Sequence, residues 1–344
     1  MPNRRLPRPP GWRLLLAGVA LVMACGPGLA QESSTELPLG GLTLVPAGDA
    51  AGLSIQSAQM QVTPDRVTIR YSVANTGGMP LDAKLVLALP RLDFSDPDVQ
   101  WAIPGIEPTN FIDAVAKVDG RPLRMAASQT ADLNGRSVAA ELRRSKISLV
   151  PVGTFQNEVQ ALQPKALETL AGAGVIQQAG TSPDGAPLYF PTWAVETVLS
   201  APVKIPADKP LALELSYRTS VGVSRDTVLR KALREKPSLA APLDALKRTY
   251  CIDAGTLAGI DKLSAAGEAN GAQMEERRIR VLLQPLIAGK PTGVLKLSVD
   301  KGRPDRITSF CSQGVKKTGP TTFQSEARDV VEPLDFRILL VGPR

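Results

Sequence analysis

Hydrophobic and polar residues alternate with a period of two through much of the chain after residue 40. In residues 65–73 every second side chain is apolar, starting at Val67, and the side chains between them are polar. The same alternation recurs in residues 211–217, 295–299 and 336–340. Because successive side chains of a strand point to opposite faces, each stretch predicts a strand with one buried face.

Residues 83–89 are apolar at almost every position, which predicts a strand that is buried on both faces. The sequence Asn75-Thr76-Gly77-Gly78 precedes this run and is typical of a turn. The chain contains 30 prolines and 29 glycines, a content that suits short strands joined by many turns. The patterns together predict a mainly β fold, with an antiparallel β-sandwich type of architecture and short helical insertions.

Two stretches have apolar residues at helical spacing instead. Between residues 155 and 171 the apolar side chains lie three or four positions apart, and Pro164 suits the first position of a second short helix. Between residues 227 and 267 the pattern predicts short helical pieces that Pro237 and Pro242 break.

The first 30 residues have the pattern of a secretory signal. The segment carries four arginines and no acidic residue, and its apolar run covers residues 14–24. That run is shorter than the roughly 20 residues that a membrane span needs. Small residues end at Ala30, just before Gln31. We therefore expect cleavage between Ala30 and Gln31 and a periplasmic or secreted protein.

Cys25 leaves a second processing route open. Residues 21–25 resemble a lipoprotein box, in which the cysteine becomes the lipidated first residue. Met23 is unusual at its position in such a box, so lipoprotein anchoring is the less favoured alternative. Anchoring to a membrane is expected only if Cys25 is lipidated.

The expected organisation has four parts. They are a signal peptide at residues 1–30, an N-terminal β-sandwich region at 31–150, a helical insertion at 151–184, and a C-terminal β-rich region at 185–344 that contains a helical segment at about 227–267. The sequence does not decide whether the two β regions share one core.

The positive charge of the chain is concentrated in the signal segment. The formal net charge is +7, and four of these charges belong to the arginines of residues 1–30, which leaves +3 for the remainder. Long tracts of one sign are absent and aromatic residues make up only 4% of the chain. Nucleic acid is therefore not an expected partner, because binding it requires clustered positive charge.

Two cysteines, Cys251 and Cys311, lie outside the signal segment. An exported chain meets an oxidising compartment, so we expect a disulfide between them. The alternative is a reactive thiol, but the chain has no histidine to act as its activating base.

The absence of histidine also excludes Ser-His-Asp and Cys-His catalysis and histidine-bearing metal sites. Gly289-Lys290 lacks the glycine that a phosphate-binding loop needs five positions earlier, where Gln284 stands. We accordingly expect no cofactor and assign no catalytic or metal-binding residue.

Three further groups of side chains are compatible with binding. Asp93, Asp96 and Asp98 could hold a calcium ion, although a solvated turn is favoured because no calcium-loop signature is present. The candidates for stacking on a sugar are Trp101, Trp193 and Tyr189-Phe190, for which core packing is favoured. The candidates for contact with an anionic surface are Arg143-Arg144 with Lys146, and Lys316-Lys317, for which a solubilising role is favoured.

Four segments in order resemble a bacterial family known as domain of unknown function 4424. They are residues 33–42, residues 65–75 with the strand at 85–90, residues 205–222, and residues 299–317. The resemblance implies an exported, mostly β protein without an established activity.

These observations favour an exported protein of the bacterial envelope that is not an enzyme and that binds another envelope component or has a structural role. The alternative is a carboxylate-based hydrolase acting on envelope polysaccharide, which would need two converging acidic side chains.

Overall fold

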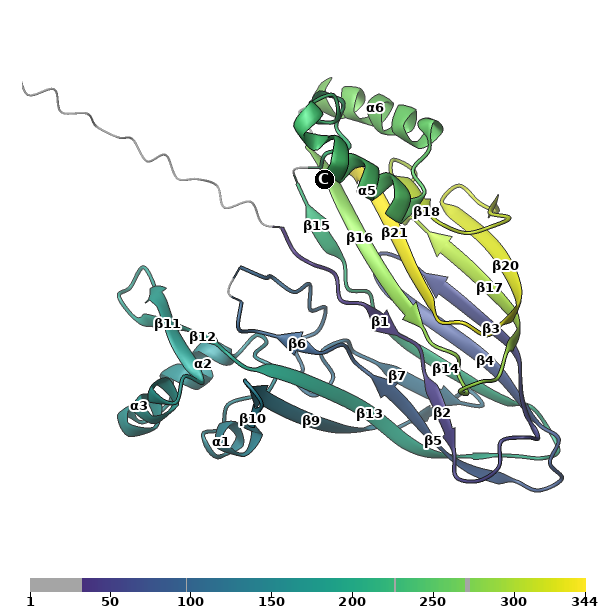
Figure 1. The fold of residues 1–344 in the computed structure, drawn as a ribbon, viewed down its shortest axis with the longest axis horizontal. Coiled ribbons are helices and arrows are strands. Elements are labelled where there is room, and N and C mark those ends of the chain that lie inside the picture. Colours follow the sequence, from purple (N-terminus) through teal and green to yellow (C-terminus); the bar gives the residue numbers. More distant parts are fainter. Residues whose placement is uncertain (1–32, 97, 226, 270–272) are drawn as a thin grey trace, which may run out of the picture. The chain divides into compact units, whose positions relative to one another are not determined.

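The computed structural model describes four stretches of the chain, residues 33–96, 98–225, 227–269 and 273–344. The predicted signal segment, its cleavage position between Ala30 and Gln31, and Cys25 lie outside the described residues. Within the described stretches, no helix is long and apolar enough to cross a membrane. The fold is mainly β and sandwich-like, as the alternating pattern predicts (Figure 1).

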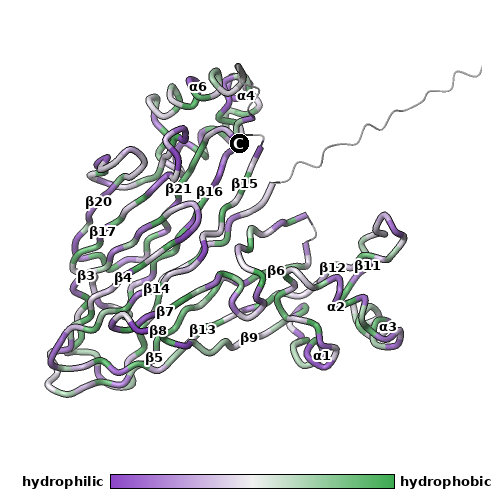
Figure 2. The backbone as a smooth tube through the Cα atoms, turned by 180° about the vertical axis from the view of Figure 1, so that it is seen from behind, coloured by the Kyte–Doolittle hydropathy of each residue, from purple (hydrophilic) through white to green (hydrophobic). Residues whose placement is uncertain are grey.

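The largest sheet has eight strands. Its order is β19 (Lys316–Lys317), β20 (Thr322–Val330), β17 (Thr292–Asp300), β3 (Leu53–Val62), β4 (Arg66–Asn75), β14 (Leu211–Arg218), β7 (Val115–Val118) and β8 (Arg121–Leu123). Neighbours in it are antiparallel except β3 and β17, which are parallel. Polar and apolar residues alternate along these strands (Figure 2), so one face is buried and the other meets solvent.

A second sheet has six strands. They are β10 (Arg136–Ser137), β9 (Ala126–Leu133), β13 (Ala194–Ile205), β5 (Leu81–Ala88) and β2 (Thr43–Pro46), with β6 (Leu92–Asp93) paired to β13. The prediction that the strand at residues 83–89 is buried on both faces is wrong. Leu85 and Leu87 are buried, but Lys84 and Ala88 are exposed, because only one face of this sheet packs against the core.

A third sheet has five strands and a fourth has two. The five-stranded sheet contains β1 (Leu39–Gly40), β16 (Met274–Leu283), β21 (Leu334–Pro343) and β18 (Ile307–Phe310), with β15 (Gly222–Ser224) paired to β16. The two-stranded sheet pairs β11 (Ile176–Thr181) with β12 (Pro187–Pro191). Position 222 requires glycine for a steric reason, because a Cβ there would lie 2.7 Å from the backbone nitrogen of Glu36.

The helices occupy the two stretches that the spacing indicates, with α1 in addition. They are α1 (Ala139–Arg144), α2 (Phe155–Gln160), α3 (Pro164–Gly172), α4 (Lys231–Arg234), the 3₁₀ helix η1 (Pro237–Leu239), α5 (Ala240–Tyr250) and α6 (Ala254–Ala269). Pro164 opens α3 as predicted. Pro242 does not break a helix, because it lies in the first turn of α5, where a backbone N–H has no partner within the helix.

One hydrophobic core joins the three larger sheets. It contains buried side chains from both of the β regions that the sequence separates, for example Leu85 and Ile69 from the first and Leu213 and Ile338 from the second. The two regions therefore share one core. A smaller core lies between α5, α6 and the five-stranded sheet, where Leu243 and Ile260 pack with residues such as Val341.

A disulfide joins Cys251 to Cys311, as the cysteine pairing predicts. Cys251 follows α5 directly and Cys311 follows β18 directly. The bond spans 60 residues of sequence. It ties the end of α5 to the start of the segment that leads into β19 and β20.

Candidate functional site

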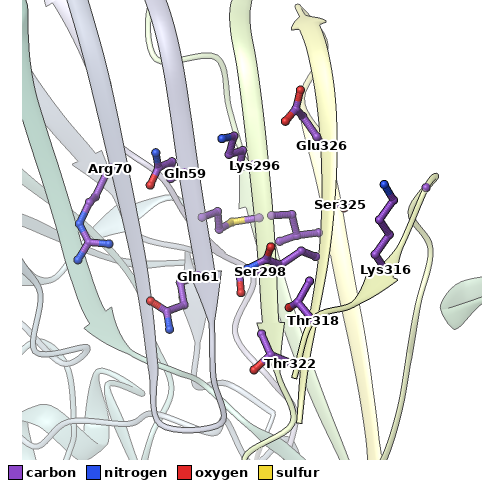
Figure 3. Close-up of a pocket in the computed structure, with 14 residues that line it drawn as sticks. Gln59, Gln61, Arg70, Lys296, Ser298, Lys316, Thr318, Thr322, Ser325 and Glu326 are labelled. Carbon is purple, nitrogen blue, oxygen red and sulfur yellow. The ribbon is translucent and has the colours of Figure 1, made fainter. Parts of the chain in front are cut away.

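A groove of about 760 Å³ lies on the solvent-facing side of the eight-stranded sheet (Figure 3). Strands β3, β4, β17 and β20 supply its floor, and the segment around β19 supplies a wall. Its labelled side chains are those of Gln59, Gln61, Arg70, Lys296, Ser298, Lys316, Thr318, Thr322, Ser325 and Glu326. None of the 14 lining residues is aromatic or an aspartate.

The strand register aligns the charged side chains of the floor in one row. Lys296 on β17 stands opposite Gln59 on β3 and opposite Glu326 on β20. Gln59 in turn stands opposite Arg70 on β4. Because directly opposed side chains in a sheet lie close together, this row places three charged groups and an amide side by side across four strands.

A second row, two residues further along the strands, is mostly uncharged. Ser298 stands opposite Gln61 on one side and Gln324 on the other. Gln324 is paired with Lys316 of β19, which completes the row at the sheet edge. Hydroxyl and amide groups both donate and accept hydrogen bonds, so this row can bind a polar ligand without fixing its charge.

Two of the four charged residues that line the groove, Arg70 and Glu326, are paired within the protein. Glu214 accepts hydrogen bonds from Lys117 Nζ at 2.9 Å and from Arg70 Nε at 2.7 Å. The Lys117 hydrogen bond, with a smaller contribution from Arg70, lowers the pKa of the Glu214 carboxyl. Glu326 is paired with Arg328 at 3.1 Å. These pairs keep Arg70 and Glu326 from acting as isolated charges.

Lys296 and Lys316 differ from these residues. Both are exposed, and within the described part of the chain neither forms an ion pair. Two cationic side chains thus line one hollow without a carboxylate partner. The groove is suited to an anionic ligand that also forms hydrogen bonds.

Contacts on both sides of β19 hold the wall of the groove. Ser312 Oγ and Ser325 Oγ are 2.8 Å apart and share a hydrogen bond. The backbone N–H of Thr318 donates to the Thr322 carbonyl at 3.0 Å. The disulfide fixes Cys311 at the beginning of the wall.

The three aspartates at residues 93–98 belong to local turns. Asp93 Oδ1 accepts a hydrogen bond from the Ser95 N–H at 2.9 Å, and this bond lowers the pKa of its carboxyl. Asp96 Oδ1 accepts one from the Asp98 N–H at 3.0 Å. No cluster of three possible metal ligands occurs among the described residues.

The aromatic candidates lie outside the groove. Trp193 is fully buried, and its Nε1 donates to the Leu149 carbonyl at 2.7 Å. Trp101 Nε1 donates to the Asp93 carbonyl at 3.0 Å. Tyr189 is partly buried and packs against the main core, and Phe190, next to it on β12, is also partly buried.

The basic candidates divide between two places. Arg143 Nη2 donates to the Gln129 carbonyl at 3.0 Å, and the neighbouring Arg144 and Lys146 are exposed. Lys316 lines the groove, whereas Lys317, the next residue of the strand, is not among the lining residues. The sequence thus indicates one cation of the site. The sequence alone does not identify the floor residues, although the polar positions in residues 59–61 and 296–298 are a signal for a polar strand face.

A general acid needs a carboxyl group with a raised pKa. Among the described residues, each carboxyl group whose pKa departs from its ordinary value has a lowered pKa. The clearest case is Asp335, where hydrogen bonds from Arg280 and Arg337 lower the pKa to about 2. The carboxyl groups with a lowered pKa are therefore suited to ion pairs and turns.

Comparison with known proteins gives a family match over most of the chain. The model of the family described as Domain of unknown function (DUF4424) matches residues 30–339. A solved structure from Legionella pneumophila subsp. pneumophila, described as a "putative nutrient binding protein", is 9% identical and has a TM-score of 0.43. The match covers 89% of this chain and 72% of that one. The comparison with curated proteins gave no match.

Proposed function

This chain belongs to the family described as Domain of unknown function (DUF4424), and from that premise we propose that it is an exported, non-enzymatic protein that binds an anionic partner in the groove. The observation that carries the proposal is the pairing state of the lysines. Lys296 and Lys316 line one polar hollow, and within the described residues neither forms an ion pair, although Glu326 stands opposite Lys296.

The floor of the groove favours recognition by charge and hydrogen bonds. Amide and hydroxyl donors such as Gln61 and Ser298 stand beside the lysines, and donors of this kind can bind the oxygens of a carboxylate or phosphate. The groove lining has no aromatic ring on which a neutral sugar could stack. The lowered carboxyl pKa values also give no support to hydrolysis by paired carboxylates.

We place the protein in the bacterial periplasm or outside the cell, with an envelope component as its partner. The signal pattern of residues 1–30 supports this compartment. Fractionation with N-terminal sequencing tests it, and the expected mature terminus is Gln31. A cytoplasmic chain that keeps Met1 would contradict export, whereas a lipidated Cys25 would place the protein on a membrane surface.

The binding proposal is tested with two anionic probes of different backbone, a polyglutamate peptide and polygalacturonate. We expect at least one probe to bind the protein and the double variant Lys296→Gln/Lys316→Gln to lose about tenfold in affinity, as two charge-assisted contacts would give. The matched control is Lys84→Gln/Lys165→Gln, which removes the same charge from exposed positions outside the groove.

Isothermal titration at low salt measures these affinities, because exposed charges are screened as the ionic strength rises. Equal losses in the two double variants would mean that net charge, and not the groove, attracts the probes. The absence of binding by both probes would refute an anionic partner.

A further inference from the structure

The outer edge of β20 is covered along only part of its length. On one side, β20 pairs with β17 from Thr322 to Val330. On the other side, β19 pairs only with Phe323 and Gln324. The edge from Ser325 onward therefore has no neighbouring strand among the described residues.

The direction of the backbone groups on this edge follows from the pairing at its start. The Thr322 carbonyl accepts hydrogen bonds from Thr318 and Gly319 on the β19 side. Peptide groups alternate in direction along a strand, so those of Glu326 and Arg328 also point away from β17. No backbone or side-chain hydrogen bond to these outward groups occurs within the described residues. They are free to pair with an added strand.

A hollow lies on each face of the sheet beside this edge. The groove on the solvent-facing side is polar and cationic. On the opposite face, a pocket of about 570 Å³ is lined by Leu295, Leu297 and Phe336, among others. Four residues line both hollows, namely Met60, Leu297, Ser325 and Glu326.

This arrangement fits one class of partner. When an extended peptide adds to a sheet edge, its main chain pairs with the edge and its side chains alternate between the two faces. Here one face offers Lys296 and Lys316, and the other offers a pocket of mixed lining whose apolar part includes Leu295, Leu297 and Phe336. On the edge itself, Glu326 and Arg328 form an ion pair at 3.1 Å, and the exposed Asp329 follows them.

Building on the proposed function, we propose that the anionic partner is a protein segment that adds to β20 as a further strand. Its alternate residues are acidic, facing the lysines of the groove, and apolar, entering the pocket lined by Leu295, Leu297 and Phe336. An acidic polysaccharide has no peptide groups to pair with Glu326 and Arg328 and no side chains for that pocket.

Three labelled peptides of equal length test the order and the backbone of the segment. The first alternates aspartate and leucine, the second has the same composition in two blocks, and the third is the alternating peptide with N-methyl groups on one edge. By fluorescence anisotropy, we expect the block and N-methylated peptides to bind about tenfold more weakly than the first.

A substitution on the protein tests the same edge. Glu326→Pro removes an outward N–H and leaves the pairing with β17 intact. We expect Glu326→Pro to bind the alternating peptide about tenfold more weakly than Glu326→Ala, which lacks the same carboxylate but keeps the N–H. The urea midpoint of each variant shows whether the fold is unchanged, and the N-methylated peptide gives the answer on the unaltered protein.

The outcomes separate the two proposals. Equal binding of the alternating and block peptides would overturn strand addition, because charge alone would then be recognised. Binding of polygalacturonate that depends on Lys296 and Lys316, without binding of any peptide, would overturn strand addition and leave the proposed function standing. If no anionic probe binds, the proposed function itself fails.

Discussion

Charged residues occur on two sheet surfaces of this protein, and the two surfaces differ in whether these residues form ion pairs. On the helix-covered face of the five-stranded sheet, Glu276 is fully buried and accepts a hydrogen bond from Arg278. Near α6, Arg234 donates to Asp261 at 2.7 Å. On the solvent face of the eight-stranded sheet, Lys296 and Lys316 have no ion-pair partner among the described residues.

The difference follows from the cost of burial. A buried charge without a partner is strongly destabilising, so a charge beneath the helices must be paired. An exposed lysine is solvated by water and can remain unpaired at little cost. The paired charges under α5 and α6 therefore stabilise the fold, and the unpaired lysines of the groove are available to bind a ligand.

The largest expected effect comes from the bond that connects these regions. Replacing Cys251 and Cys311 with alanine should lower the free energy of unfolding by about 4 kcal/mol on the chain-entropy model for a loop of this length. It should also weaken probe binding, because Cys311 begins the wall of the groove. Urea denaturation and titration measure the two effects. Unchanged stability would show that the bond does not constrain the unfolded chain.

Glu276→Gln should lower the free energy of unfolding by about 2 kcal/mol, because it leaves Arg278 without a carboxylate partner. The guanidinium is partly exposed, which reduces the penalty. The matched change in the groove, Glu326→Gln, should shift stability by less than about 0.5 kcal/mol because that ion pair is exposed. Urea denaturation compares them. Similar losses of unfolding free energy at both positions would contradict the difference between the two surfaces.

Asp335 gives an intermediate, pH-dependent effect. Its pKa of about 2 lies below the ordinary value of 3.8, so its ion pairs contribute stability above pH 4 that is lost as the pH falls toward 2. Asp335→Asn should cost about 1 kcal/mol at neutral pH, after allowance for solvent screening of this partly exposed group. The difference from the unaltered protein should shrink between pH 4 and pH 2. A constant difference would contradict this origin.

Glu214→Gln should have the smallest effect and the opposite sign on binding. It removes the carboxylate that pairs with Arg70 and so adds a third unpaired cation to the groove. We expect affinity for the acidic probes to rise about threefold, as one more partly screened contact would give. Titration measures it, and a weaker affinity would show that Glu214 orients Arg70 toward the ligand.

The strands and the disulfide could be predicted from the sequence because their signals are local or compositional. The alternation in residues 65–73 gave β4, and the two cysteines left after the signal segment gave the bond. The burial of residues 83–89 could not be predicted, because apolar side chains on both faces do not show which faces another layer covers. Pro242 shows the same limit for helices, since its effect depends on where the first turn begins.

The groove could not be predicted because its floor depends on long-range register. Gln59 and Lys296 are adjacent only because β3 and β17 pair in parallel, more than 200 residues apart in sequence. Periodicity shows which face of each strand is polar but does not show which strands are neighbours. Lys316 could be identified as a basic residue, and only the fold places it at the wall of the groove.

Zero-length crosslinking tests most directly whether the groove binds the anionic partner. A carbodiimide joins a carboxylate to a lysine amine in contact with it, and peptide mapping by mass spectrometry then identifies the lysine. With the alternating acidic peptide at low occupancy, we predict crosslinks concentrated at Lys296 and Lys316. Crosslinks spread evenly over these and exposed lysines elsewhere, such as Lys84 and Lys165, would contradict the account.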